Sequence, residues 1–136
     1  MDFIAENFGG RSLVDPSWSK IELGLKQIDE RKNSYCILTA DSGSYLQCAG
    51  GQNEVSIEYR EILKGGFNHY VLSRGPIERP LKTVWHNINC NVGPIRVHRN
   101  EVLTLEDAMI AFKFFLINSN VPPDFNKRNV TKQMTE

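Results

Sequence analysis

The chain has 136 residues, of which 40% are hydrophobic and 24% charged, and its 16 basic residues balance its 16 acidic ones. This composition is typical of one globular domain that needs no metal or disulfide to fold, and the zero net charge argues against nucleic acid or an anionic membrane as a partner. The three cysteines have no paired spacing, and we find no signal peptide and no apolar stretch long enough to span a bilayer. We therefore expect a cytoplasmic protein with a single domain over residues 1–136, with an arm at 1–11 and a tail at 122–136.

The first predicted element is an amphipathic helix. Asp15-Pro16 offers a capping residue followed by proline at the first helical position. Apolar residues then recur every three or four positions, at Trp18, Ile21, Leu25 and Ile28. The pattern predicts a helix that ends near the charged run 29–32. Residues 1–11 precede it and include Gly9-Gly10 near their end, which favours an arm or a short strand.

Six short strands follow in the predicted order. Residues 35–40, 45–49 and 54–60 form a meander, and residues 67–73, 82–90 and 95–99 add three further strands. In the third run Val55, Ile57 and Tyr59 share one face, while Glu54, Ser56, Glu58 and Arg60 share the other. This alternation predicts one buried and one solvated face.

The last predicted element is a second helix that begins after Thr104 and ends before Pro122-Pro123. Its apolar stripe is formed by Leu105, Ala108, Met109, Phe112, Phe115 and Leu116. Helix, strands and helix in this order predict an α+β fold: a single, mostly antiparallel sheet of about six strands, with an N-terminal and a C-terminal helix packed on one face.

The sequence contains none of the common catalytic spacing motifs. Cys36, Cys48 and Cys90 could approach one another, and a histidine could complete a metal site, but buried structural thiols are the better explanation for cysteines on strands. We therefore expect no enzymatic activity, no metal and no cofactor.

His69 and His86 lie on strand faces with apolar neighbours, so both can point inward. Each is either a core histidine hydrogen-bonded to the backbone or a general base with Glu58 or Glu61 nearby. The second interpretation keeps one alternative open, a small α+β enzyme or ligand-binding domain whose pocket is lined by histidine and by Cys48 or Cys90.

Trp85 is the most informative single residue. The alternation that turns Val84, His86 and Ile88 inward turns Trp85 outward beside Asn87. A tryptophan among small polar residues is typical of a protein-binding surface. The alternative is that the N-terminal arm or a loop covers it.

The balanced charge divides unevenly along the chain. Residues 1–61 carry ten acidic and six basic residues, a net charge of −4, and residues 62–136 carry +4. Asp41, Glu54 and Glu58 could form an acidic face that fits the basic cleft of a nucleic-acid enzyme. Direct nucleic-acid binding by the basic half is the weakest of the hypotheses, because no aromatic residues interleave its bases.

The order of these elements resembles a known family. The runs 34–38, 45–51 and 55–60, then Trp85, then 100–108 leading into Phe112 and 115–116, together with the end 121–125, resemble the first-numbered immunity-protein family of bacterial polymorphic toxin systems. The resemblance implies an α+β protein of the cytoplasm that binds and silences a toxin encoded beside it, commonly a nucleic-acid deaminase.

Together these observations predict an immunity protein, an inhibitor of a toxin, that occludes the active site of a cognate toxin domain. The partner-binding residues we expect are Trp85, Tyr70, Asp41, Glu54, Glu58 and Asn87. Trp85 and Tyr70 would be the aromatic anchors, and the three carboxylates would be charge partners.

Overall fold

The computed structural model describes residues 1–75 and 84–134. Its strands are β1 (Asp2–Ala5), β2 (Leu13–Val14), β3 (Tyr35–Thr39), β4 (Tyr45–Gly50), β5 (Val55–Leu63), β6 (Gly66–Arg74), β7 (Trp85–Ile88), β8 (Ile95–His98) and β9 (Phe125–Asn129). Its helices are α1 (Trp18–Lys26), α2 (Leu105–Asn118) and the short α3 (Thr131–Met134), with 3-10 turns at Glu6–Phe8 and Arg99–Glu101.

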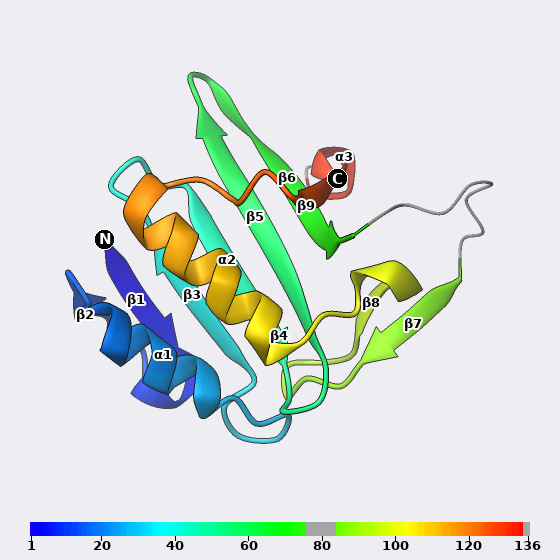
Figure 1. The fold of residues 1–136 in the computed structure, drawn as a ribbon, viewed down its shortest axis with the longest axis horizontal. Helices are drawn as coiled ribbons and strands as arrows, with labels where there is room; N and C mark the ends of the chain where they lie inside the picture. The colour runs from blue at the N-terminus through cyan, green and yellow to red at the C-terminus, as the bar shows by residue number, and fades with distance from the viewer. Residues whose placement is uncertain (76–83, 135–136) are drawn as a thin grey trace.

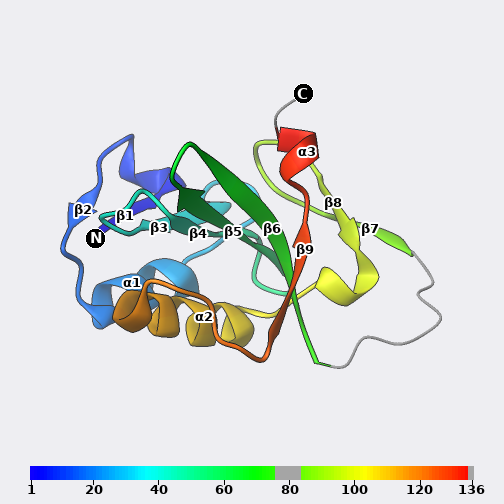
Figure 2. The same ribbon diagram turned by 90° about the horizontal axis from the view of Figure 1, so that it is seen from above.

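Seven of the strands form one antiparallel sheet in the order β2-β1-β3-β4-β5-β6-β9 (Figure 1). α1 and α2 both lie on one face of this sheet (Figure 2). The predicted α+β class and the antiparallel sheet are therefore confirmed. The prediction of about six strands in one sheet and two helices differs in detail: the main sheet has seven strands, β7 and β8 pair only with each other in a separate sheet, and α3 is a third helix.

The main core lies between the sheet and the two helices. Its largest fully buried side chains include Phe3, Leu38, Leu46, Ile57, Leu72, Phe112 and Phe115. α1 packs so closely on β1 that a Cβ on Gly24 would lie 2.7 Å from the Phe3 ring. This close approach explains a glycine within a helix, where it otherwise costs about 1 kcal/mol relative to alanine.

The start of α1 differs from the prediction. Ser17, not Asp15, is the N-cap, and its Oγ accepts from the Lys20 backbone N–H at 3.4 Å. Asp15 instead contacts the start of the chain, where its backbone N–H donates to the Met1 carbonyl at 2.7 Å. Its φ is 48°. A residue tied to the first strand in this left-handed conformation cannot cap the helix.

α2 begins as predicted. The Thr104 hydroxyl accepts from the Asp107 backbone N–H at 3.1 Å, and the Asp107 carboxylate accepts from the Thr104 N–H at 3.0 Å. This reciprocal capping places two acidic residues in the first turn, where the helix dipole favours them.

Within the described residues, the predicted arm and the predicted tail each contain a strand. Residues 2–5 form β1, which pairs with β3, because Phe3 and Ala5 alternate into the core. Residues 125–129 form β9, which pairs with β6 and places Phe125 in the same core. The sequence FNKRN carries little strand signal, and only the exposed edge of β6 makes it a strand.

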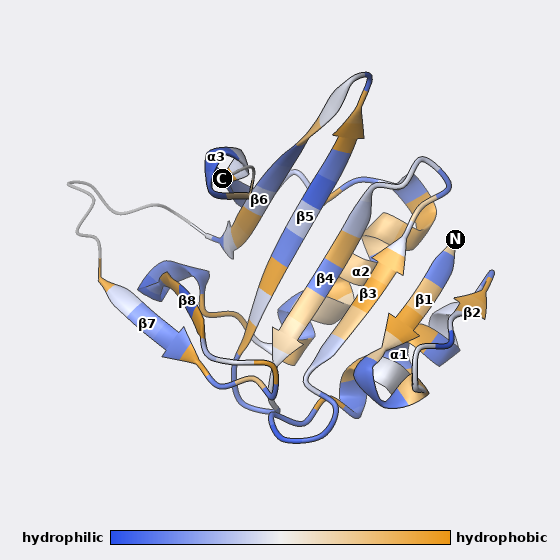
Figure 3. Cartoon of the chain, turned by 180° about the vertical axis from the view of Figure 1, so that it is seen from behind, coloured by the Kyte–Doolittle hydropathy of each residue, from blue (hydrophilic) through white to orange (hydrophobic). Residues whose placement is uncertain are grey.

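The face opposite the helices is only partly solvated. The β7–β8 hairpin covers one side of it through a second small core of Val71, Ile88, Val97 and Val130. Figure 3 looks onto this face and shows hydrophilic positions along β5 and β6. Val55, Ile57 and Tyr59 point to the helices as predicted, but Ser56, predicted on the solvated side, is buried. No helix in the described part of the chain is long and apolar enough to cross a membrane.

Candidate functional site

Trp85 is the aromatic residue that β7 presents at the surface. Its side chain is 45% exposed. Arg96 lies 4.6 Å and Arg128 5.9 Å from the ring centroid, and the His98 ring contacts it edge-on at 4.6 Å. Trp85 is therefore outward, as the alternation predicts, and not covered by another described segment. Cation–π and edge contacts on several sides restrict the rotamers of the indole.

The alternation holds at the end of β7, but Val84 just before the strand, which is predicted to point inward, is exposed. Asn87 is exposed and Ile88 fully buried, so the strand offers Trp85 and Asn87 to solvent on one face. Residue 83, which the alternation also places on that face, lies outside the described residues.

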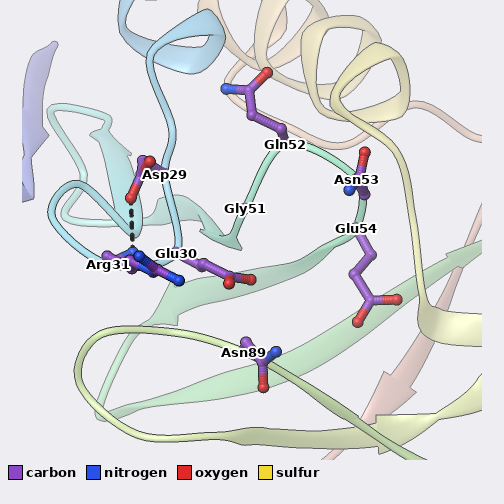
Figure 4. Close-up of a pocket in the computed structure, with 8 residues that line it drawn as sticks. All are labelled: Asp29, Glu30, Arg31, Gly51, Gln52, Asn53, Glu54 and Asn89. Atoms are coloured by element: carbon purple, nitrogen blue, oxygen red, sulfur yellow. Dashed lines mark hydrogen bonds between the residues drawn. The ribbon is translucent and has the colours of Figure 1, made fainter.

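Beyond the end of β7, a polar pocket of about 340 Å³ opens beside the loops that follow α1 and β4 (Figure 4). It is lined by Asp29, Glu30, Arg31, Gly51, Gln52, Asn53, Glu54 and Asn89, and we call it the acidic pocket. Three carboxylates against one guanidinium give it an electronegative lining.

The loops that form the acidic pocket are held in place by their own side chains. The Asp29 carboxylate accepts from the backbone N–H groups of Arg31 at 2.8 Å and Lys32 at 3.2 Å. Gln52 donates from its amide to the carbonyls of Lys26, at 2.9 Å, and Ile28. The Asp29 bonds fix the first loop internally, and Gln52 ties the second loop to the end of α1, so the lining is preorganised.

Glu54 connects the acidic pocket to the hairpin. Its carboxylate lies 3.0 and 3.1 Å from His86 Nε2 on β7. His86 is 40% exposed at its side chain, so the prediction that it points into the core is wrong. The apolar side of β7 packs through Ile88, and His86 lies at the margin of that contact.

His69 is buried on β6, as the core interpretation predicts, but its ring contacts side chains and not the backbone. Its Nε2 lies 2.7 Å from Glu58 Oε1, and its Nδ1 accepts from Arg60 Nε at 3.1 Å. An acceptor at Nδ1 means that the neutral ring carries its proton at Nε2 and donates it to Glu58. Both ring nitrogens are engaged, which leaves neither to act as a base in this arrangement.

A second cleft lies between the β7–β8 hairpin, β5 and the C-terminal segment, with a volume of about 190 Å³; we call it the hairpin cleft. It is lined by Ser56, Glu58, Val71, Trp85, Ile95, Arg96, Val97, Arg128, Val130, Gln133 and Met134. Ser56 Oγ is the buried side-chain oxygen for which the described residues provide no hydrogen-bond partner.

The thiols behave as structural groups. Burial raises the pKa of Cys36 to about 12 and that of Cys48 well above its ordinary value. Cys36 and Cys48 face each other across β3 and β4, and Cys90 is partly buried with its Sγ 3.1 Å from Ser34 Oγ. The described residues contain no group of three or more His, Cys, Asp or Glu side chains that could hold a metal.

The structure brings together four of the six predicted partner-binding residues and places the other two elsewhere. Trp85, Asn87, Glu54 and Glu58 lie on or beside the hairpin and its clefts. Tyr70 lies on the helix face, stacked on Tyr59 at 5.9 Å, so it does not share a surface with Glu58 on the other face. Asp41 lies in the turn after β3, 3.3 Å from the N-terminal amine and about 20 Å along the sheet from Glu54.

Sequence reasoning missed Asp29, Glu30 and Asn89 as companions of Glu54. Asp29 and Glu30 come from the loop after α1 and Asn89 from the loop after β7, and only the packing of the hairpin against the sheet brings them to Glu54. Ser56 was not recognised as a buried lining residue, because the alternation of residues 54–60 assigns it to the solvated face.

Compared with known proteins, the sequence matches no protein-family model and no curated protein.

Proposed function

We propose that this protein is an immunity protein that binds a cognate bacterial toxin, of the nucleic-acid-targeting deaminase type, and neutralises it by occluding its active site. The proposal joins the family resemblance of the sequence to the surface around β7. The single observation that supports it is Trp85, a large aromatic side chain exposed at the surface and in contact with Arg96, Arg128 and His98.

Trp85 has the properties of an interface anchor. Tryptophan and arginine are the residues most enriched among binding hot spots, and Arg96 and Arg128 flank the indole. A side chain that is already ordered loses less entropy on binding. Neither exposure nor order at this position is needed for the main core, which lies on the other face of the sheet.

The acidic pocket supplies the electrostatic part of the proposal. An enzyme that acts on nucleic acid needs a basic cleft to hold phosphates, and a carboxylate-lined surface complements that cleft. β7 spans about 13 Å between Trp85 and the pocket. One standard-size interface, about 800 Å² per partner, covers both features and takes about a tenth of the 8139 Å² surface.

The test is to clone the genes that flank the gene of this chain and to express each product with and without it. We expect one product to stop growth and this chain to restore it, with a one-to-one complex recovered by size exclusion. If no flanking product is toxic, or if toxicity is unchanged by the chain, the proposal is wrong.

The alternative, a small enzyme or ligand-binding domain with a pocket of histidine and cysteine, draws less support from the geometry. The linings of the acidic pocket and the hairpin cleft contain neither residue type. Cys48 is fully buried in the main core, and the His69 ring is committed to Glu58 and Arg60.

A further inference from the structure

We infer that the hairpin cleft is a socket for one tyrosine side chain of the protein partner, with the phenol hydroxyl bound at Ser56. This inference deepens the proposed function and rests on it for the identity of the partner. It starts from Ser56 itself, whose side chain is 1% exposed and whose Oγ has no hydrogen-bond partner among the described residues.

A buried hydroxyl without a hydrogen-bond partner lowers the stability of the fold, because burial removes the water that would otherwise bond to it. The other buried serine at the margin of the hairpin is fully used: Ser34 Oγ donates to Glu6 at 2.9 Å and lies 3.1 Å from Cys90 Sγ. Ser56 differs in that it lines a cleft. A ligand group in that cleft would provide the missing partner.

The size of the cleft selects a single side chain. Small-molecule sites commonly have about 300–1,000 Å³, which is more than the 190 Å³ found here. A cavity of about 150 Å³ is enough to hold a benzene ring. The hairpin cleft therefore has room for one six-membered ring and a small polar group.

The lining selects an aromatic ring with a hydroxyl tip. Val71, Val97, Val130, Ile95 and Met134 supply apolar walls. Next to Ser56, the Glu58 carboxylate is a further acceptor, since a carboxylate has room for several hydrogen bonds and His69 takes one. A phenol can donate to Glu58 and accept from Ser56 at the same time.

Charge argues against the other long side chains. Two guanidinium groups, Arg96 and Arg128, also line the cleft, and they disfavour lysine or arginine. Repulsion from the Glu58 carboxylate disfavours aspartate or glutamate. A neutral phenol is repelled by neither charge, and its ring can lie against Trp85 or a guanidinium.

The experiment uses para-cresol, which is the tyrosine side chain as a free molecule, and toluene, which lacks only the hydroxyl. Amide shifts of the full chain are followed by NMR as each compound is added to the wild type, to Ser56→Ala and to the control Ser73→Ala. Ser73 is also a buried serine on the face of the main sheet opposite the two helices, but it does not line the hairpin cleft.

We expect para-cresol to bind saturably at millimolar concentration, with shifts confined to the cleft, and toluene to bind at least about tenfold more weakly, because toluene forms neither the bond to Glu58 nor the bond to Ser56. Ser56→Ala should reduce that preference by about three- to tenfold, the value of one neutral hydrogen bond, and Ser73→Ala should keep it. Absence of saturable binding at the cleft, or an unchanged preference in Ser56→Ala, overturns the inference.

The complex with the toxin then tests the occupant. Each exposed tyrosine of the toxin is changed to phenylalanine and combined with Ser56→Ala in a double-mutant cycle. One tyrosine should couple to Ser56, and additivity at every tyrosine overturns the assignment. If the chain neutralises a toxin but does not bind para-cresol, the tyrosine socket is wrong and the proposed function stands. If the chain binds para-cresol but neutralises no toxin, the proposed function is wrong and the socket stands.

Discussion

Arg128 of β9 holds the buried carboxylate of Glu101 with two hydrogen bonds, from Nε at 2.7 Å and from a terminal nitrogen at 2.9 Å. The Glu101 side chain is 2% exposed and also accepts from the His98 backbone N–H at 2.7 Å. This pair fastens the end of the hairpin to the edge of the main sheet. It thereby positions Trp85, which lies against the same guanidinium.

Removing the arginine should destabilise the fold strongly. Arg128→Met leaves a buried carboxylate without its charged partner, and we expect a loss of about 3–5 kcal/mol in the free energy of unfolding. Lys127→Met is the control on the same strand, where an exposed cation lies 5.0 Å from the Tyr70 ring, and it should cost about 1 kcal/mol or less. Urea unfolding measures both, and equal losses would contradict the role of the pair.

Trp85→Ala should affect binding more than stability. If the indole is a central anchor, affinity for the toxin falls by about 2 kcal/mol or more, while its exposure limits the loss of stability. Leu23→Ala, an exposed apolar residue on α1, should leave the affinity unchanged. Calorimetric titration and urea unfolding separate the two effects, and lost stability with unchanged affinity would assign Trp85 to the fold alone.

The two fully buried serines should respond in opposite directions. Ser56→Ala removes an unpartnered hydroxyl and should raise the free energy of unfolding of the free protein by about 1 kcal/mol. Ser34→Ala should lower it by about 1–3 kcal/mol, because it removes the hydroxyl hydrogen bond to the Glu6 carboxylate and the contact with Cys90 Sγ. Thermal unfolding of the three proteins checks the signs, and a loss in Ser56→Ala would show that its hydroxyl is satisfied.

Stability should fall in acid partly through Glu6. Hydrogen bonds from Ser34 N–H at 2.7 Å, from Asn91 at 2.9 Å and from the Ser34 hydroxyl lower the pKa of Glu6 below its ordinary 4.5. Its contribution is therefore complete above about pH 4.5, the unfolded value, and is lost as the pH falls through the lower folded value.

The variant Glu6→Gln isolates this contribution. Its deficit in stability relative to the wild type should be largest near neutral pH and should shrink below pH 4.5. Urea unfolding measured from pH 7 to 3 follows the deficit. A deficit that does not vary with pH would mean that the Glu6 charge contributes nothing to the fold.

The thiols should differ in reactivity. Burial raises the pKa of Cys36 to about 12, so almost no thiolate exists at neutral pH, and Cys48 is fully buried beside it. Iodoacetamide should label Cys90 first and the other two only after unfolding, which mass spectrometry of timed samples can follow. Early labelling of Cys36 would contradict the packing of α1 on β3.

The sequence by itself determined the elements whose own residues repeat with a clear period. The two-residue alternation of Val55, Ile57 and Tyr59 and the capped apolar stripe after Thr104 place β5 and α2, because local geometry alone sorts those side chains into faces. The same alternation places Trp85 at the surface.

The tertiary structure alone decided which of these faces meet. β9 is a strand because β6 offers it a partner, and Ser56 is buried because the β7–β8 hairpin covers it. The acidic pocket and the pairing of Arg128 with Glu101 join segments distant in the chain. Such contacts depend on how separate elements pack, and local periodicity carries no information about that packing.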